Sequence, residues 1–392
     1  MRIGVTCSAG DGGKSGISTY LKQIIGNMAK VNCSDELYLF IGSDDDFLEE
    51  VIPKNAVVHR ISGLFAKPVT NIFWHLFLLP ILCWWYRLDV LFLPAGNRRL
   101  TLWAPCEAVA TVHDLSQLHV SNKYDGFRLF YVLRLLPYLM RRMSRIITVS
   151  ESTALDVRKY AKVENDHISV VHNGIDRSNY QPQKEGKDRE RLSRRYGIDS
   201  PYILYTSRLE HPGKNHLRLL EAFERIQKEN EHLSKFKLVC VGAPWPGAEA
   251  IFQRVEELDL EEQVIFTGYA DYEDLPRLYS CAECFVFPSL FEGFGLPLLE
   301  AMSCHVPVAC SNVSSLPEVA GEAAEYFDPE KPEAIAEAIL NVCSCHERAE
   351  ELVRLGKKRV AHFSWARCAQ ETISTIKNTS GGEAWIAVPE RR

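Results

Sequence analysis

Residues 289–301 have the sequence Ser289-Leu-Phe-Glu-Gly-Phe-Gly-Leu-Pro-Leu-Leu-Glu-Ala301, in which two carboxylates flank a turn rich in glycine and proline. The preceding apolar run, Cys284-Phe-Val-Phe287, is followed by proline and predicts a short buried strand. Pro297 suits the first turn of a helix, because its missing N–H would have no intrahelical partner there. We therefore expect a strand, a loop that carries Glu292, and a helix with Glu300 in its first turn.

The loop and the helix start in this stretch predict an anion-binding site. The backbone N–H groups of Phe294, Gly295 and Leu296 lie at the positive end of the expected helix. A diphosphate suits this position, and the two carboxylates beside it could hold hydroxyl groups. The alternative is a helix N-terminus without a ligand, in which the dipole favours an ordinary glutamate in the first turn.

The same stretch resembles the E-x7-E motif of retaining glycosyltransferases of the GT-B fold, the family that includes sucrose, trehalose, glycogen and many mannosyl transferases. The match includes Gly293-Phe-Gly-Leu-Pro297 between the glutamates, and Ala301-Met302 and Pro307-Val308 after them. The resemblance implies two Rossmann-like domains facing a central cleft. It also implies that Glu300 holds ribose hydroxyls, that Glu292 holds a sugar hydroxyl, and that residues 294–296 supply backbone donors to the nucleotide sugar.

Two basic residues resemble the pair that neutralises the donor diphosphate in this family. Arg208 follows an expected strand that ends near Tyr205, and Lys214 precedes an expected helix. Negative charge grows on the diphosphate as the glycosidic bond breaks, and a guanidinium and an ammonium group would stabilise it. Gly213 stands where the family often has a third basic residue. The alternative is that both residues are ordinary surface charges.

Two segments near the N-terminus also resemble the family. Gly10-Asp-Gly-Gly-Lys-Ser-Gly16 resembles its glycine-rich loop over the donor phosphates and the acceptor, with Gly16 the best-matched position and Ser15 in place of a usual glycine. His113 and Asp114 resemble the family's pair at the sugar, which implies that the imidazole bonds a donor hydroxyl. The alternative for His113 is a cap at the end of a strand.

Short apolar strands alternate with helical segments along the chain, which predicts parallel sheets with crossover helices. The pattern occurs twice, so we expect an α/β protein with two Rossmann-like domains. We place the first domain at 1–175, a polar linker at 176–199 and the second domain at 200–362. The resemblance to the GT-B family implies that the first domain binds the acceptor and the second binds the nucleotide sugar. It also implies that a C-terminal helix at about 363–378 crosses back to the first domain. The expected strands are 2–6, 37–41, 57–61, 90–93, 108–112, 145–149, 168–171, 202–205, 237–241, 263–266, 284–287 and 306–309.

Length and composition fit this organisation, since 392 residues with 46% apolar side chains suffice for two buried cores. The net charge is −6, yet residues 51–150 carry 12 Lys and Arg against 4 acidic residues. This excess predicts an anionic surface or acceptor, whereas nucleic acid is not expected because no binding motif accompanies it. The chain opens directly with a strand, and its 12 cysteines lie scattered in apolar runs, which is typical of a cytoplasmic protein with reduced thiols.

Two apolar segments raise the question of a membrane. Ile72–Tyr86 is almost entirely apolar but falls short of the ~20 residues of a spanning helix, so we expect a helix packed on the sheet with a membrane-facing edge. Phe127–Arg145 interleaves five arginines with apolar residues, which fits either contact with anionic lipid headgroups or a core helix with solvated arginines. A peripheral position on the inner face of the plasma membrane is therefore expected.

Several other motifs are weaker. Cys281-Ala-Glu-Cys284 has metal-ligand spacing without a second pair, and Asp44-Asp-Asp46 contains a D-x-D pattern in a polar loop, so no metal and no further cofactor are expected. Gly13-Lys-Ser15 fits the end of a nucleoside-triphosphatase loop, but Ser8 replaces its first glycine. Gly293-Phe-Gly295 lacks the third glycine of a dinucleotide-binding fingerprint.

The resemblance thus implies a retaining, metal-independent hexosyltransferase that uses a nucleotide sugar and a glycan or lipid-linked glycan acceptor in surface polysaccharide synthesis. GDP-mannose is the first expectation for the donor, because Pro212-Gly-Lys-Asn-His216 resembles bacterial polysaccharide mannosyltransferases, and UDP-hexoses stay open. Three alternatives stay open as well: a nucleotide-sugar epimerase of the same architecture, a catalytically silent binding protein and, more remotely, a P-loop nucleoside triphosphatase.

Overall fold

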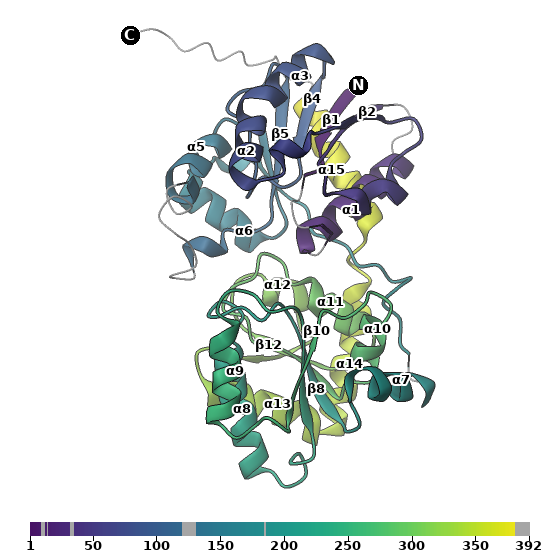
Figure 1. Ribbon diagram of the computed structural model, residues 1–392, viewed down its shortest axis with the longest axis vertical. Coiled ribbons are helices and arrows are strands. Elements are labelled where there is room, and N and C mark those ends of the chain that lie inside the picture. Colours follow the sequence, from purple (N-terminus) through teal and green to yellow (C-terminus); the bar gives the residue numbers. More distant parts are fainter. Residues whose placement is uncertain (9–11, 14, 32–34, 120–130, 184–185, 381–392) are drawn as a thin grey trace. The chain divides into compact units, whose positions relative to one another are not determined.

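The computed structural model describes residues 1–8, 12–13, 15–31, 35–119, 131–183 and 186–380. The chain divides into two compact units (Figure 1), of which unit 1 comprises Met1–Gly174 with Ser364–Arg392 and unit 2 comprises Ile175–Phe363. Each unit is built on one parallel sheet whose strands alternate with helices. The expected α/β architecture with two Rossmann-like domains is confirmed.

The sheet of unit 1 has seven described strands in the order β3-β2-β1-β4-β5-β6-β7. The chain order reverses between β1 and β4, which are hydrogen-bonded neighbours. The strands are β1 (Arg2–Thr6), β2 (Glu36–Ile41), β3 (Val57–Arg60), β4 (Val90–Leu93), β5 (Glu107–Val112), β6 (Arg145–Thr148) and β7 (Ile168–Val170). The helices and helical turns are α1 (Gly16–Val31), η1 (Asp46–Val51), η2 (Gly63–Phe65), α2 (Pro68–Phe73), η3 (Trp74–Leu78), α3 (Leu79–Trp85), η4 (Ser116–Leu118), η5 (Tyr131–Leu135), α5 (Leu136–Met140), α6 (Glu151–Asp156), η6 (Val157–Ala161), η7 (Asn165–His167) and α15 (Trp365–Thr379).

The sheet of unit 2 has six described strands in the order β10-β9-β8-β11-β12-β13, and its chain order reverses between β8 and β11. The strands are β8 (Tyr202–Thr206), β9 (Lys237–Val241), β10 (Val264–Gly268), β11 (Cys284–Phe287), β12 (Val308–Ser311) and β13 (Glu325–Phe327). The helices are α7 (Gly186–Tyr196), α8 (His216–Glu229), α9 (Ala248–Glu257), α10 (Leu275–Ser280), α11 (Leu296–Ser303), α12 (Leu316–Ala320), α13 (Pro332–Ser344) and α14 (His346–Val360).

Each expected strand is present, with ends that differ by at most two residues from the expectation. The sequence did not predict β13, which has three residues, Glu325-Tyr-Phe327, of which Phe327 is buried. This edge strand pairs with β12 alone, so it lacks the apolar run of a strand between two neighbours.

Unit 2 begins at Ile175, so the segment 176–199, which was expected to link the domains, is part of this compact unit. Its charged stretch forms α7, whose arginines bind the buried Asp274 on the N-terminal side of α10. The Nε atom of Arg191 lies 2.7 Å and the Nη1 atom of Arg195 lies 2.8 Å from this carboxylate. The many charges that suggested a solvated linker therefore serve as ion-pair partners.

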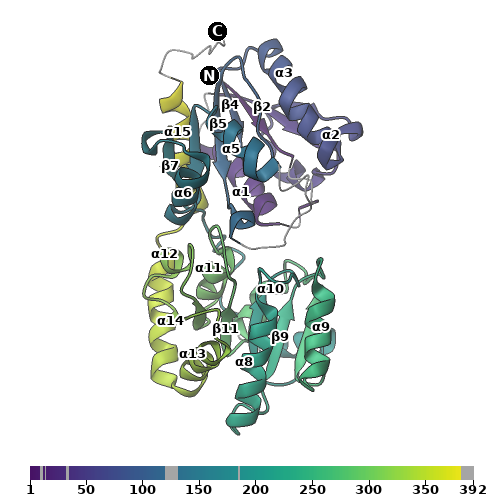
Figure 2. The same ribbon diagram turned by 90° about the vertical axis from the view of Figure 1, so that its left-hand side faces the viewer.

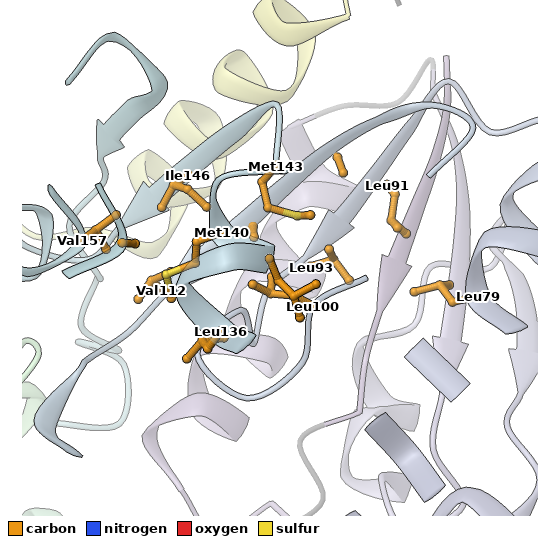
Figure 3. Packing of buried hydrophobic residues seen from close by; sticks show 14 of the residues in the cluster. Leu79, Leu91, Leu93, Leu100, Val112, Leu136, Met140, Met143, Ile146 and Val157 are labelled. Carbon is orange, nitrogen blue, oxygen red and sulfur yellow. The ribbon is translucent and has the colours of Figure 1, made fainter. Parts of the chain in front are cut away.

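The core of unit 1 joins the central strands to the helices above them. Figure 3 shows Leu79 of α3, Leu91 and Leu93 of β4, and Leu136 and Met140 of α5 within one cluster of buried apolar side chains. Burial of such side chains stabilises the folded unit by roughly 1.5–3 kcal/mol each before the entropy loss is counted. The inner sides of α3 and α5 are thereby fixed to the sheet.

Two π-helical turns, η3 and η5, each precede a proline inside a longer helical stretch. Pro80 and Pro137 lack the N–H that would bond the carbonyl groups of Leu76 and Leu133, four residues earlier, and both carbonyls belong to the π turns. Proline therefore accounts for the wider turn at both places.

The C-terminal helix α15 returns to unit 1, as the resemblance implied, and packs beside α1 (Figure 1). Trp365 of α15 meets Tyr20 of α1 with ring centroids 6.1 Å apart. The ammonium group of Lys377 lies 3.1 Å from the buried carboxylate of Asp35.

Candidate active site

The candidate site in unit 2 lies at the carboxyl ends of β8 and β11. These strands are hydrogen-bonded neighbours at the point where the chain order of the sheet reverses. In open α/β sheets, ligands bind in the crevice beside such a switch point. Arg208 and Lys214 follow β8, and Glu292 follows β11, so three predicted residues belong to this edge of the sheet.

Lys214 and Glu292 are in direct contact. The Lys214 Nζ atom donates a hydrogen bond of 2.5 Å to Glu292 Oε1, and the two side chains are 19% and 16% exposed. The Tyr205 hydroxyl donates to the Lys214 carbonyl over 2.6 Å, and the Leu290 N–H donates to the Gly213 carbonyl over 3.0 Å. The two loops are thus joined by backbone and side-chain bonds, and the ammonium group is held at the switch point.

The end of the neighbouring strand β12 supports the Glu292 loop. The Glu292 N–H donates to Ser314 Oγ over 3.0 Å. The buried Ser315 hydroxyl lies 2.9 Å from the Glu292 carbonyl and 3.0 Å from the Phe294 carbonyl. These bonds reach the backbone on both sides of Gly293. The segment after β12 therefore holds the Glu292 loop in place, in addition to the segments after β8 and β11.

Gly295 is the residue on which the start of α11 depends. Its φ is +98°, a left-handed conformation that favours glycine, and a Cβ there would lie 2.8 Å from Leu316 Cδ2. The helix begins at Leu296, Pro297 has no N–H, and the Leu298 N–H donates to the Gly295 carbonyl over 3.0 Å, so the start of the helix closes back on Gly295. Phe294 is buried, and its ring meets Phe363 at 5.8 Å, so its side chain packs in the core and its backbone is the part suited to a ligand.

Glu300 lies in the second turn of α11, which corrects the expectation of the first turn. The helix starts one residue earlier than Pro297, so Glu300 is its fifth residue. Its Oε2 atom accepts a hydrogen bond of 2.7 Å from the Tyr279 hydroxyl, and Tyr180 donates a second one. Burial raises the pKa of Glu300, while these two hydrogen bonds oppose the rise. The carboxylate thus already accepts hydrogen bonds from hydroxyl groups, the kind of bond that ribose hydroxyls would make.

Arg208 has two partners that the sequence did not predict. Its Nη2 atom lies 3.0 Å from the buried carboxylate of Glu210, and its guanidinium group lies over the Trp245 ring at 4.7 Å. Trp245 is 49% exposed in the turn after β9, and an exposed tryptophan between two prolines was a signal that could have marked it. The guanidinium plane is therefore fixed by a charge and by an aromatic face.

Two further residues that sequence reasoning missed lie at the start of α8, where Asn215 is the N-cap and His216 is the first helical residue. The Asn215 side chain donates to the carbonyl groups of Pro288 and Pro329 over 2.9 and 2.7 Å, which ties α8 to the loop after β11. His216 is buried with Nε2 at 3.3 Å from Ser207 Oγ, and burial, with a smaller effect of Lys214, lowers its pKa to about 3. His216 is therefore neutral and leaves the charge at this edge to Lys214 and Arg208.

His113 lies in unit 1, directly after β5. Its Nε2 atom is 2.7 Å from the Pro94 carbonyl, and since a carbonyl can only accept, Nε2 carries the proton and Nδ1 is an acceptor. Burial lowers the pKa of His113 to about 4, so the ring is neutral near pH 7. The ring also meets the edge of Tyr20 at 4.7 Å. A neutral imidazole with an acceptor nitrogen suits a hydroxyl partner.

Gly16 is the exposed first residue of α1, and the Ser15 carbonyl accepts from the Thr19 N–H over 3.0 Å. The predicted glycine-rich loop lies partly outside the described residues, namely at Gly10, Asp11 and Lys14. His113 and Gly16 belong to unit 1, whereas Arg208, Lys214, Glu292, Phe294, Gly295, Leu296 and Glu300 belong to unit 2.

Neither weak metal motif forms a ligand set. Cys281 and Cys284 are buried free cysteines, and interaction with the Cys343 thiol, together with burial, raises the pKa of Cys284. Asp46, in the D-x-D segment, pairs with Arg60 at 3.2 Å. In the part of the chain that the structure describes, one group could offer three metal ligands, the exposed cluster 164–167 in unit 1, and it contains none of the predicted site residues.

Comparison with known proteins agrees with this geometry. Residues 188–359 match the family described as glycosyl transferases group 1, and residues 14–179 match glycosyltransferase family 4. The chain is 33% identical over 270 residues to O-antigen chain mannosyltransferase B of Escherichia coli, covering 69% of this chain and 70% of that protein. The chain belongs to glycosyltransferase family 4. Another relative, O-antigen chain mannosyltransferase RfbU of Salmonella typhimurium, is 27% identical over 66% of this chain and 69% of its own length.

Solved structures agree with the fold of this family 4 member. Sucrose-phosphate synthase of Thermosynechococcus elongatus has a TM-score of 0.76 at 20% identity, over 96% of this chain and 98% of that one. Anabaena HepE, solved with UDP and glucose, has a TM-score of 0.74 at 20% identity, over 96% and 99%. At such identities the likeness concerns the fold, and it supports the GT-B architecture. The protein is a glycosyltransferase.

Proposed function

We propose that this family 4 enzyme transfers mannose from GDP-mannose, with retention of the anomeric configuration, to a glycan or lipid-linked glycan acceptor in surface polysaccharide synthesis. Two relatives from different bacteria carry the name O-antigen chain mannosyltransferase, which supports the sugar and the class of acceptor. A UDP-hexose is the alternative donor, for which HepE with UDP and glucose is the precedent.

The observation that carries the proposal is the Lys214–Glu292 pair at the switch point of unit 2. The carboxylate of Glu292 balances the charge of the Lys214 ammonium group at 2.5 Å. A bound nucleotide sugar would bring a diphosphate to Lys214, Arg208 and the N-terminal turn of α11. The Glu292 carboxylate would then accept a hydrogen bond from a sugar hydroxyl. Glu300 would hold the ribose hydroxyls in place of its two tyrosine partners.

Chemistry on the same face of the sugar fits these residues. In the proposed reaction, the bond between the anomeric carbon and the phosphate oxygen breaks through an oxocarbenium-like state. The acceptor oxygen forms the new bond to the anomeric carbon on the same face, and the leaving phosphate takes the proton of the acceptor hydroxyl. Lys214 and Arg208 stabilise the charge that grows on that phosphate, and fixed cations of this kind supply the role that a metal has elsewhere. We therefore also propose that transfer needs no metal ion. In unit 1, neutral His113 would accept a hydrogen bond from a substrate hydroxyl.

The basic region 51–150 and the proposed acceptor together favour a cytoplasmic enzyme that contacts the inner face of the plasma membrane peripherally. Nucleic acid is not among the proposed partners, since the basic residues accompany no nucleic-acid-binding motif.

A donor panel tests this function. The purified enzyme is incubated with GDP-mannose, UDP-glucose, UDP-galactose or UDP-N-acetylglucosamine, together with acceptor lipids extracted from bacterial membranes, and the products are separated. We expect a new mannosylated lipid with GDP-mannose. A free nucleotide sugar with altered stereochemistry would instead indicate an epimerase. Binding of nucleotide sugars without any product would indicate a catalytically silent protein.

A further inference from the structure

The helical stretch Pro68–Trp85, formed by α2, η3 and α3, carries a row of large apolar side chains on its outer side. In Figure 2 this stretch lies at the outer side of unit 1. The row is exposed by 46–72% per residue and is called the outer stripe below. It consists of Val69, Phe73, Phe77, Ile81, Trp84 and Trp85.

The π-helical turn η3 keeps this stripe on one side. Its residues recur at every fourth position up to Ile81, and such a row drifts around an α-helix of 3.6 residues per turn. A π turn contains more residues than an α turn, so a four-residue step turns the row in the opposite direction. The turn η3 therefore reverses the drift between Phe73 and Phe77. The rings of Phe73 and Phe77 accordingly lie together, with centroids 4.9 Å apart.

The opposite side of the same stretch is fixed in the core. Trp74, Leu79 and Cys83 are buried in the cluster shown in Figure 3, where Leu79 is labelled. Within the described residues, Pro68–Trp85 is the single helix long and apolar enough to cross a membrane by length and composition, and a third of it is buried. Spanning a bilayer would pull these core residues out of unit 1. The stretch is therefore built to lie along a surface.

Charge indicates which surface. Residues 64–88 contain no aspartate or glutamate, and the exposed cations Lys67 and Arg87 stand at the two ends of the stretch. Trp84 and Trp85 lie next to Arg87, and tryptophan and arginine side chains are favoured at the level of lipid headgroups. The surrounding region 51–150 carries 12 basic against 4 acidic residues. An apolar stripe between cations complements an anionic lipid surface.

The arginine-rich helix of the same unit is less suited to this role. Arg141 donates to the Ala161 carbonyl over 2.9 Å, and Arg142 donates to the Leu102 carbonyl over 2.8 Å. These guanidinium groups hold neighbouring segments of unit 1 together, so neutralising them would disturb the fold. Its segment 120–130 lies outside the described residues.

We propose that the outer stripe docks unit 1 on an anionic lipid bilayer, with α2 and α3 lying in the plane of the headgroups. This proposal names the surface of unit 1 that makes the membrane contact of the proposed function. It rests on the proposed function for one point, the reason why the enzyme contacts a membrane. Trp84 and Trp85 enter the acyl boundary, while Lys67 and Arg87 stay with the headgroup phosphates.

Vesicle flotation tests the stripe. Full-length protein is mixed with vesicles of phosphatidylcholine alone or with 30% phosphatidylglycerol, for the wild type, Trp84→Ser/Trp85→Ser and Phe73→Ser/Phe77→Ser. Trp103→Ser is the matched control, because Trp103 is 46% exposed in the same unit and lies outside the stripe. We expect the wild type and the control to float with anionic vesicles, and each double variant to bind at least tenfold more weakly with an unchanged melting temperature.

Equal flotation of the wild type and both double variants would overturn the proposal, as would no flotation of the wild type. Sedimentation velocity without lipid gives a second check: a wild-type dimer that Trp84→Ser/Trp85→Ser dissociates would assign the stripe to a second copy of the chain instead. Sugar transfer to a detergent-solubilised acceptor, measured on the same samples, separates the two proposals. Sugar transfer without flotation of the wild type would contradict the docking proposal and support the proposed function. Flotation without sugar transfer would support the docking proposal and contradict the proposed function.

Discussion

Lys214 and Glu292 show how two residues that are far apart in the chain form one charged unit at the head of the unit 2 sheet. Their atoms lie 2.5 Å apart and both side chains are mostly buried. A partly buried ion pair costs desolvation that its attraction barely offsets, so stability alone gives little reason for it. A ligand that replaces Glu292 as the partner of Lys214 gives a better reason for placing this ion pair here.

The first prediction concerns the charge on the leaving phosphate. Lys214→Ala and Arg208→Ala should each lower turnover by roughly 100-fold or more, as expected for the loss of one preorganised charge donor. Initial rates with saturating donor measure the effect. Lys187→Ala, which removes an exposed lysine of α7, should leave the rate unchanged. Near-normal turnover in both site variants would contradict the assignment.

The second prediction separates the roles of the two partners. Glu292→Gln removes the carboxylate that pairs with Lys214, so GDP should bind at least as tightly as it does to the wild type. Turnover should nevertheless fall by at least tenfold, because the proposed bond to the sugar hydroxyl loses its charged acceptor. Calorimetry with GDP and a rate measurement test both parts. Weaker GDP binding would show that Glu292 organises the phosphate site instead.

The third prediction concerns His75, which is fully buried and donates from Nδ1 to the Asn71 carbonyl over 2.9 Å. Burial, together with the charge of Arg99, lowers its pKa to about 3. The unfolded chain binds a proton here below about pH 6.5, whereas the folded chain does not until about pH 3, so stability falls as pH drops through 6.5. At pH 5 this residue alone should cost about 2 kcal/mol.

Melting temperatures of the wild type and His75→Gln at pH 7 and pH 5 measure this effect. The variant should melt lower at pH 7 but lose less on acidification than the wild type does. An equal or larger loss in His75→Gln would show that other groups control the acid sensitivity.

At the scale of elements, the loop after β11 and the start of α11 form the part on which the site depends. The fourth prediction is that Gly295→Ala destabilises the protein by about 1–3 kcal/mol, because alanine at φ +98° is strained and its Cβ would press on Leu316. Nucleotide binding should weaken as well, since the first turn of α11 must shift. Gly186→Ala is the control, because a Cβ there meets no atom within 4 Å. Equal melting temperatures for both variants would contradict this account.

The sequence predicted strands better than helix starts or edge segments. Buried central strands such as β8 and β11 have four apolar residues in a row, which is a local signal. The place of Glu300 depended on one residue, since α11 begins at Leu296 rather than Pro297. The charged helix α7 resembled a linker, because its partner Asp274 lies about 80 residues further along the chain and local pattern cannot show that contact.

At the scale of the molecule, topology explains why the predicted residues gather. Parallel strands place their carboxyl ends on one edge, so residues after β8 and β11 had to lie near each other once the strand order was known. The motif alone did not show that Lys214 pairs with Glu292, that Arg208 lies on Trp245, or that tyrosines hold Glu300. Those contacts join segments separated by tens of residues and depend on side-chain packing. Residue roles toward the donor stay predictions that the variants above test.

The central claim is a retaining, metal-independent mannosyl transfer, and the anomeric configuration of the product tests it most directly. The enzyme is incubated with GDP-mannose and acceptor lipid in the presence and absence of a chelator, and the new linkage is assigned by NMR. We predict that the mannoside keeps the α configuration of the donor and forms at the same rate in the chelator. A β-linked product, or activity that disappears in the chelator and returns with magnesium or manganese, would contradict the account.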